Sequence, residues 1–444
     1  MDMDKYNIKS YGCKWIKFRL WKRIGTEVIF NMKICNVSAR QIYDSRGVPT
    51  VEASVVLSDG SVGVGSAPSG ASTGSYEAHE KRDRLEPHFG KGVMTAVENV
   101  NTKIREALSG MDAMRQAAVD ECMIELDESP NKANLGANAT IAVSWAVADA
   151  AAKSLRLPLY RWLGGVQAAD MPCPMFNVIN GGKHAGNNLE IQEFMFVPVG
   201  ADSFHEAMRM GTECYHALHG LLREAGLNTG VGDEGGFAPN LERDEQALEW
   251  MVRAIEKAGW VPGEDVGLAM DIAASEWARG EGYVQQKSGR TYTQDMLVQM
   301  YADLAKRYPL ISIEDPLGEE DFAGFRRLTD ELGADMMIVG DDLFTTNSER
   351  IFRGIAMGAA NAVLIKPNQI GTVTETLDAI RIARQNGYSV IVSHRSGETE
   401  SSAIADLAVA VNAEYIKAGA PARGERLAKY NRLLQIEREL YLER

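Results

Sequence analysis

The chain is poor in cysteine and in uninterrupted apolar sequence. Its five cysteines among 444 residues are scattered and show no CxxC spacing, which argues against a disulfide framework or a cysteine zinc site and favours a reducing, cytoplasmic setting. The longest apolar-rich tract, residues 137–152, carries Asn138, Thr140, Ser144 and Asp149. Those polar side chains predict a buried helix, so no membrane span is expected.

Positive charge is in the minority. The chain has 47 Lys and Arg against 61 Asp and Glu, a formal net charge of −14. This charge repels nucleic acid, so we expect no nucleic-acid partner, and an anionic substrate would need local cations. The composition is 45% hydrophobic and 24% charged, which is typical of a soluble globular protein with two or three domains, or with one large barrel and an appendage.

Residues 1–32 have a positive net charge, opposite to that of the whole chain. They carry seven basic and three acidic residues, with Trp15, Phe18 and Trp21 interleaved. A secretory signal needs an unbroken apolar region of about 7 to 15 residues, which this segment lacks. One interpretation is a basic, aromatic arm for a partner or a surface, and the other is a non-essential N-terminal extension. We favour the extension, because Met32 could itself serve as a starting methionine.

The next segment predicts a small sheet followed by helices. Residues 50–57 are rich in β-branched side chains, and a turn signal leads from them to a hairpin partner at residues 61–67. From residue 93 to residue 163 apolar side chains recur every three and four positions, which is typical of helices. Gly164 and Gly165, followed by prolines, mark a boundary. We therefore predict an α+β domain over residues 33–165.

Residues 166–444 contain a repeated unit, a short apolar run that ends in a polar residue and is followed by a loop and a helical stretch. The polar residues are Asp271, Glu314, Asp341, Lys366, His394 and Lys417. They are 43, 27, 25, 28 and 23 positions apart, close to the length of one strand, loop and helix. This periodicity predicts an α/β fold, a parallel, TIM-like β/α barrel in which the carboxyl ends of the strands open on one face and bring these residues together.

Three of these strand ends carry carboxylates, Asp271, Glu314 and Asp341. A single acid in such a place is more often a helix cap or turn former than a ligand. Three carboxylates facing one cavity, however, would repel one another strongly unless a divalent cation neutralised them. Since the three include no histidine or cysteine, the set favours Mg²⁺.

Lys366 follows a fourth strand. Beside a divalent cation its neutral form should be favoured, which a general base requires near neutral pH. The alternative role is a salt bridge to the carboxylates. Pro367 favours extended backbone at Lys366, which is compatible with either role.

Two further acids, Glu193 and Glu234, are candidates for acid catalysis. Glu193 ends the apolar run 189–191, and Glu234 lies in the glycine-rich sequence GDEGG at 232–236. Two carboxyl groups in one pocket cannot both ionise easily, so one could keep a proton and act as a general acid. The alternative is that the glycines mark only a tight turn.

Several longer motifs occur in a fixed order from about residue 33 to residue 444. They are SGASTG at 69–74, NGGKHAG at 180–186, QEFM at 192–195, GDEGG at 232–236, SIEDP at 312–316, DDL at 341–343, Lys366 with NQIGT at 368–372, SHRSGETE at 393–400, and IK at 416–417 with GAPAR at 419–423. Together they resemble the enolase family. Many motifs in one order are far more specific than any single one of them.

The resemblance implies a lyase that dehydrates 2-phosphoglycerate reversibly to phosphoenolpyruvate in glycolysis and gluconeogenesis, with two Mg²⁺ ions. Asp271, Glu314 and Asp341 would hold the first ion, which also binds the substrate carboxylate. Ser72 would help hold the second, recruited with the substrate phosphate. The loop at 69–74 would close over the bound ligand.

The resemblance also implies catalytic roles. Lys366 would take the proton from carbon 2, Lys417 and both ions would stabilise the resulting enediolate, and Glu234, paired with Glu193, would assist loss of the carbon-3 hydroxyl. The implied substrate-binding set comprises His184, Gln192, Glu193, Glu314, Asp341, His394, Arg395, Ser396 and Lys417.

The family resemblance further implies a cytoplasmic homo-oligomer, dimer or octamer, with which a surface or secreted pool is compatible. Val48, Pro367 and Ser401 depart from residues common in the family, although none replaces a catalytic position. Two alternatives are a related enzyme acting beside a different carboxylate and a non-catalytic binding protein. Retention of every costly buried charge favours catalysis on the usual substrate.

Overall fold

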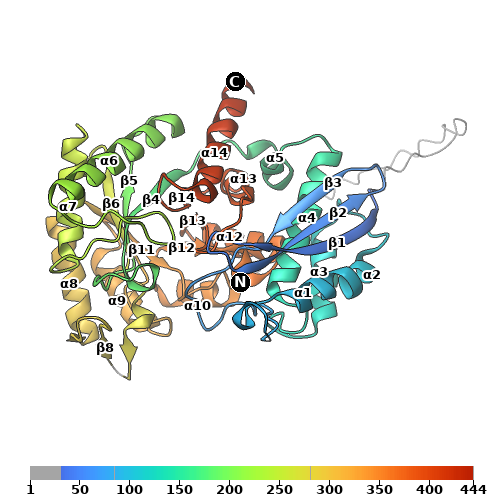
Figure 1. The fold of residues 1–444 in the computed structure, drawn as a ribbon, viewed down its shortest axis with the longest axis horizontal. Coiled ribbons are helices and arrows are strands. Elements are labelled where there is room, and N and C mark those ends of the chain that lie inside the picture. The colour runs from blue at the N-terminus through green and yellow to red at the C-terminus, as the bar shows by residue number, and fades with distance from the viewer. Residues whose placement is uncertain (1–31, 85, 281, 444) are drawn as a thin grey trace, which may run out of the picture. The chain divides into compact units, whose positions relative to one another are not determined.

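The computed structural model describes residues 32–84, 86–280 and 282–443 (Figure 1). The basic N-terminal extension predicted above lies outside these residues, apart from Met32. In the described ranges no helix combines the length and the apolar character that crossing a bilayer requires.

A three-stranded antiparallel sheet begins the described chain. Its strands are β1 (Ile34–Tyr43), β2 (Pro49–Leu57) and β3 (Val62–Ser66), in that order. Val56 lies opposite Val62 across the β2–β3 turn, and Gly60 takes a positive φ of 89° in that turn. The predicted hairpin is therefore confirmed.

Helices follow the sheet, as the spacing predicts. They are α1 (Met94–Asn99), a π-helical turn (Val100–Ile104), α2 (Arg105–Leu108), α3 (Gln116–Asp127), α4 (Ala137–Ser154) and α5 (Leu159–Gly164). α4 is buried along nearly its whole length and packs against β2 and β3. Its alanines leave little side chain between the helix and the strands, so the backbones approach closely.

The second part of the chain contains a closed barrel of eight strands. The strands are β4 (Cys173–Asn180), β5 (Glu193–Val197), β6 (Gly267–Asp271), β10 (Leu310–Glu314), β11 (Met337–Gly340), β12 (Ala362–Ile365), β13 (Ser389–Ser393) and β14 (Tyr415–Lys417). Each barrel strand from β6 onward ends at the predicted polar residue or one position before it. The combination of a barrel with an N-terminal α+β part confirms the predicted fold class.

The barrel is not wholly parallel, so the sequence-based expectation is wrong on this point. β5 runs antiparallel to both β4 and β6. The crossover between two parallel strands is usually a helix, whereas residues 181–192, which join β4 and β5, contain only the short turn Gly182–His184. Glu193 consequently begins β5 instead of ending a strand, and the reversal still brings it to the same end of the barrel, opposite Asp271.

Helices surround the barrel (Figure 1). They are α6 (Phe204–Glu224), α7 (Glu245–Lys257), α8 (Gln294–Arg307), α9 (Phe322–Leu332), α10 (Ser348–Met357), α11 (Pro367–Ile370), α12 (Val373–Gln385), α13 (Ala403–Ala410) and α14 (Gly424–Glu443). A small sheet of β7 (Ala278–Arg279), β8 (Gly282–Val284) and β9 (Thr291–Tyr292) fills the longest interval of the repeat. Several helices begin at a polar side chain that accepts a backbone N–H, as Ser203, Thr293, Asn347 and Thr372 do.

The interior of the barrel is filled by apolar side chains. One buried cluster consists of Met175, Met195, Val197, Ala269, Val339, Ala362, Leu364 and Ile391. Such layers make a barrel a packed core and leave its strand ends as the place for polar groups.

Gly63 provides a test of the packing between the sheet and α4. A Cβ at this position would overlap the carbonyl oxygen of Ala146 and the backbone nitrogen of Ala150. We expect Gly63→Ala to lower the free energy of unfolding by about 1–3 kcal/mol, because neither backbone atom can yield easily. Urea denaturation measures this change. Val64→Ala, at a side chain that is 43% exposed, is the control and should change stability by about 0.5 kcal/mol or less.

Candidate active site

The strand ends of the barrel bring the predicted charged residues together. Glu314 lies directly opposite Asp271 in the β10–β6 register, and Asp341 follows β11. Lys366 follows β12, and Lys417 ends β14. Residues separated by about 150 positions in the sequence therefore meet at one end of the barrel.

Lys417 is the buried cation at the centre of this cluster. Its Nζ lies 3.0 Å from Glu193 Oε2, 2.9 Å from Glu314 Oε2 and 3.4 Å from Asp271 Oδ2. Burial alone would lower the pKa of Lys417, but Glu193 and the other acids outweigh burial and raise it well above its ordinary value. Lys417 is consequently a permanent positive charge.

Lys366 forms a close ion pair with Asp341. Burial alone would lower the pKa of Lys366, yet the Asp341 carboxylate outweighs it and raises that pKa. The expected preference for the neutral amine concerns Lys366 beside a divalent cation, so it stays a prediction; in this structure Asp341 pairs with the ammonium group itself. The residue after it, Pro367, is the first residue of α11, where a missing N–H costs nothing.

At Glu314, an ionised carboxylate is strongly destabilised by its surroundings. Burial, together with nearby Asp271, raises the pKa of Glu314 to about 8. Neutralisation by a divalent cation would remove that penalty, since a bound ion reverses the local electrostatics. The oxygen-only donor set of Asp271, Glu314 and Asp341 thus suits a hard cation in charge and chemistry.

The three predicted metal ligands do not converge on one point. Within the described ranges, the groups whose ligand atoms lie within 4.8 Å of one another are His184, Glu193 and Glu234, and Asp315, Asp341 and Asp342. Lys366 and Lys417 contact the carboxylates of the predicted set instead. In the second group, Asp315 accepts the backbone N–H of Asp341 and of Asp342 at 2.9 and 2.7 Å, so its carboxylate is already occupied.

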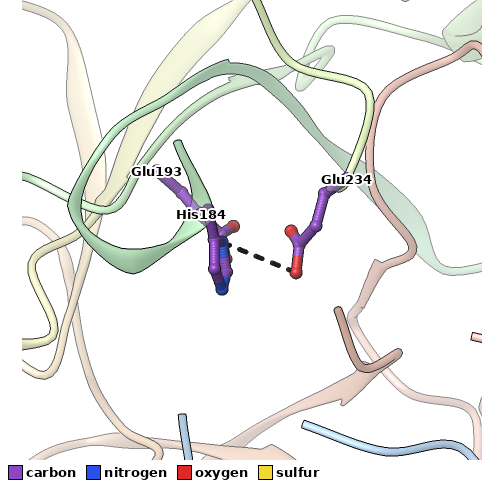
Figure 2. Close-up of side chains that lie close together, drawn as sticks. All are labelled: His184, Glu193 and Glu234. Carbon is purple, nitrogen blue, oxygen red and sulfur yellow. Dashed lines mark ion pairs between the residues drawn. The ribbon is translucent and has the colours of Figure 1, made fainter. Parts of the chain in front are cut away.

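Glu193, Glu234 and His184 form a second buried cluster (Figure 2). His184 Nδ1 lies 3.5 Å from Glu193 Oε1 and 3.6 Å from Glu234 Oε1. Burial and neighbouring Glu234 raise the pKa of Glu193 well above its usual range. Burial would also raise the pKa of Glu234, but His184 and His394 outweigh it and lower that pKa well below its usual range. These opposite shifts make Glu193 the more readily protonated member of the pair.

His394 borders the same carboxylate. Arg426 Nη1 lies 2.5 Å from His394 Nδ1, and because arginine only donates, the ring proton belongs on Nε2. That nitrogen lies 3.3 Å from Glu234 Oε2. Asn177 Nδ2 donates to Glu234 Oε2 at 2.9 Å. Glu234 is therefore held from several sides.

These groups line one small cavity at the barrel end. Its volume is about 20 Å³, room for about one water molecule. Its lining includes Ser72, His184, Gln192, Glu193, Glu234, Asp271, Lys366, His394, Arg395, Ser396 and Lys417. Four buried atoms of this lining have no hydrogen-bond partner among the described residues, namely His184 Nδ1, Gln192 Oε1, Glu193 Oε2 and His394 Nε2. All but Gln192 Oε1 lie within 3.6 Å of an ionisable group. Buried polar atoms normally have partners, so Gln192 Oε1 suits a contact with a polar ligand.

The loop at 69–74 covers this cavity. Ala71 N donates to Ser396 Oγ at 2.6 Å, and Arg395 Nη2 donates to the Ser72 carbonyl at 3.1 Å. A Cβ at Gly70 would overlap Arg395 Nη2, so only glycine allows this approach. The structure therefore brings Ser72, Arg395 and Ser396 together, and the loop is closed over them.

Several buried partners of the site do not emerge from the sequence patterns. Glu77 contacts Arg395, Gln369 contacts Asp341, and Asn177 and Arg426 contact the Glu234 region. Glu77 lies three residues after the loop at 69–74, and Gln369 lies within NQIGT. Closeness to these motifs is all that the sequence offers to mark either residue. Their contacts span up to about 320 positions, so periodicity cannot reveal them.

His394 provides a test of the electrostatics. Burial lowers the pKa of His394 to about 4, compared with about 6.5 in an unfolded chain. Between these values the unfolded state binds more protons, so this group makes stability rise with pH from about 4 to 6.5. We expect ¹⁵N NMR at pH 6 to show a neutral His394 ring protonated on Nε2, with His394→Asn identifying the signal. A ring that becomes charged near pH 6.5 would contradict this assignment.

Models of known families match nearly all of the described chain. Residues 34–163 match the family model described as the enolase N-terminal domain. Residues 168–443 match the model described as the enolase C-terminal TIM barrel domain. These matches agree with the closed barrel, its small N-terminal α+β part and the clustered carboxylates and lysines at the strand ends, and the chain therefore belongs to the enolase family.

Proposed function

We propose that this protein is a hydro-lyase that converts 2-phospho-D-glycerate reversibly to phosphoenolpyruvate and water. The observation that supports this most strongly is that Lys366, Lys417, Glu193 and Glu234 line the same cavity. The reaction needs a base at carbon 2, a fixed positive charge for the developing dianion and a proton source for the leaving hydroxyl. These four side chains have the matching chemistry.

Asp271, Glu314 and Asp341 offer the oxygen donors that would hold a first Mg²⁺ once Lys366 and Lys417 release them, and Ser72 would help hold a second ion that arrives with substrate. When bound, the two ions would neutralise charge on the substrate carboxylate and phosphate oxygens. The pKa of Glu314 is raised to about 8, which means that the protein alone compensates its negative charge poorly. A bound cation would compensate that charge and favour the ionised form that can bind metal.

Lys366 is proposed to take the proton from carbon 2. Its charged form is held by Asp341. Once Asp341 serves as a metal ligand, Lys366 loses that partner and burial favours the neutral amine that can accept a proton. Lys417 keeps its charge and stabilises the enediolate that forms when the electron pair moves toward the carboxylate.

The Glu193 and Glu234 pair is proposed to supply the second proton. Burial and Glu234 raise the pKa of Glu193, which favours a proton on this carboxyl group. Transfer of that proton to the carbon-3 hydroxyl releases water as the carbon 2–carbon 3 double bond forms, which balances the proton taken by Lys366. His184, Gln192, His394, Arg395 and Ser396 complete the proposed substrate contacts.

We also propose a cytoplasmic homo-oligomer, in keeping with the family, and a division into domains at residues 33–165 and 166–444. The family models end and begin on either side of that boundary. Light scattering distinguishes a dimer from an octamer by mass.

The proposed reaction is tested directly by ultraviolet absorbance. Purified protein with 2-phosphoglycerate and Mg²⁺ should generate absorbing phosphoenolpyruvate, and excess chelator should stop the reaction because the carboxylates then repel the substrate. Readdition of Mg²⁺ should restore the rate. Absence of turnover in both directions with Mg²⁺ present would refute the proposal.

The base assignment is tested with Lys366→Ala. We expect kcat to fall by about 10²- to 10⁴-fold, the usual cost of removing a general base. Calorimetry should still detect Mg²⁺ binding, because the carboxylates remain. Lys306→Ala is the matched control, at a lysine whose side chain is 73% exposed. Near-normal turnover of Lys366→Ala would exclude Lys366 as the base.

A further inference from the structure

Glu77 is a buried acid next to the site that the proposed reaction leaves without a role. Its side chain is 8% exposed and that of Arg395 is 3% exposed. The two form a bidentate pair, in which Arg395 Nη1 donates to Glu77 Oε2 at 2.9 Å and Nη2 donates to Oε1 at 3.1 Å. A buried pair with this geometry fixes both the position and the plane of the guanidinium group.

The hydrogen-bond inventory of Arg395 shows what this pair leaves available. A guanidinium group has five N–H donors. Two go to Glu77, one on Nη1 goes to Asn368 Oδ1 at 3.2 Å, and one on Nη2 goes to the Ser72 carbonyl at 3.1 Å. Only the Nε donor of Arg395 has no partner in the described part of the chain.

The free donor and the Ser72 contact lie on the same edge of the guanidinium group. The Nε–H is parallel to the N–H of Nη2 that lies on the Nε side. Together these two donors form a second fork. Glu77 occupies the fork between Nη1 and Nη2. A phosphate can therefore bind Arg395 through two parallel hydrogen bonds only on the Nε and Nη2 edge, where one oxygen would replace the Ser72 carbonyl.

We propose that Glu77 is a positioning residue for the substrate phosphate: by holding Arg395 through the Nη1 and Nη2 fork, it presents the Nε and Nη2 edge to the cavity. This inference rests on the proposed function, since it assumes a phosphorylated substrate at Arg395. Glu77 would thus affect phosphate binding through Arg395, without contacting the substrate itself.

The surroundings of Glu77 fix its carboxylate in turn. Gly74 N donates to Glu77 Oε1 at 3.1 Å, which ties the carboxylate to the loop that carries Ser72. Gln369 Nε2 lies 3.3 Å from the same oxygen and donates to Asp341 Oδ1 at 2.9 Å. Glu77 thus connects the predicted phosphate contact with the loop and with a predicted metal ligand.

Two substitutions separate geometry from charge. Glu77→Gln keeps the length of the side chain but turns one acceptor into a donor, which cannot pair with a guanidinium N–H. Glu77→Asp keeps the charge but withdraws the carboxylate by about one carbon–carbon bond, roughly 1.5 Å, so it cannot reach both nitrogens. If phosphate binding depends on the geometry of the Glu77–Arg395 pair, both variants lose the bidentate pair and should be impaired. If it depends only on the charge of Glu77, Glu77→Asp should behave like wild type.

The experiment measures KM for 2-phosphoglycerate and kcat for both variants at saturating Mg²⁺. We expect KM to rise about tenfold or more in each, the effect of losing about 1.4 kcal/mol of binding, with a smaller change in kcat and an unchanged Mg²⁺ requirement. Glu80→Gln is the matched control. It removes a negative charge from the same segment, and Glu80 pairs with Arg82 at 2.6 Å instead of Arg395.

A double-mutant cycle with Arg395→Lys tests whether Glu77 acts through Arg395. Lysine has no fork to orient, so Glu77→Gln should change KM by less than about twofold in that background. Equal KM values in wild type, Glu77→Gln and Glu77→Asp would overturn the inference, and so would an undiminished effect of Glu77→Gln beside Arg395→Lys. If either Glu77 variant does not fold, the other carries the comparison.

A second measurement keeps this inference separate from the proposed reaction. Binding of inorganic phosphate is followed by calorimetry in the wild-type protein and in both variants, with Mg²⁺ present. Weaker phosphate binding in the variants supports the role of Glu77 even if no turnover is found, whereas equal binding, or none in wild type, refutes it. Wild-type turnover with unaltered variants would refute only the role of Glu77.

Discussion

The concentration of buried charge at one end of the barrel is the constraint on which the rest of this structure depends. Lys417, almost fully buried, lies within 3.4 Å of Glu193, Asp271 and Glu314. Removing one member of such a group would leave the others uncompensated in a medium where an isolated charge is very costly. The apolar layer beneath them and the closed barrel keep the separate strand ends in place.

One reversed strand extends what the barrel can bring to this site. Because β5 is antiparallel, its first residue, Glu193, reaches the same end as the last residues of the parallel strands. The short connection before β5 also carries His184 and Gln192 into the cavity. The hairpin thus supplies three polar side chains from a stretch that a regular β/α unit would use for a helix.

The part before the barrel closes the site. The loop after β3 lies over the cavity, and its carbonyl at Ser72 and carboxylate at Glu77 both bind Arg395. Gly70 permits that approach, because any side chain there would overlap the guanidinium group. Arg395 consequently helps to link the two parts of the chain through hydrogen bonds and not through apolar packing alone.

The sequence by itself determined the elements and the candidate residues. The repeated spacing of Asp271, Glu314, Asp341, Lys366 and Lys417 predicted strand ends, because the length of a strand, loop and helix is a local property. Tertiary structure alone decided the reversal of β5, the opposite pKa shifts of Glu193 and Glu234, the pairing of Lys366 with Asp341 and the bidentate contact of Glu77 with Arg395. Each of these depends on distances between residues far apart in the chain and on burial, and neither quantity is encoded in local spacing.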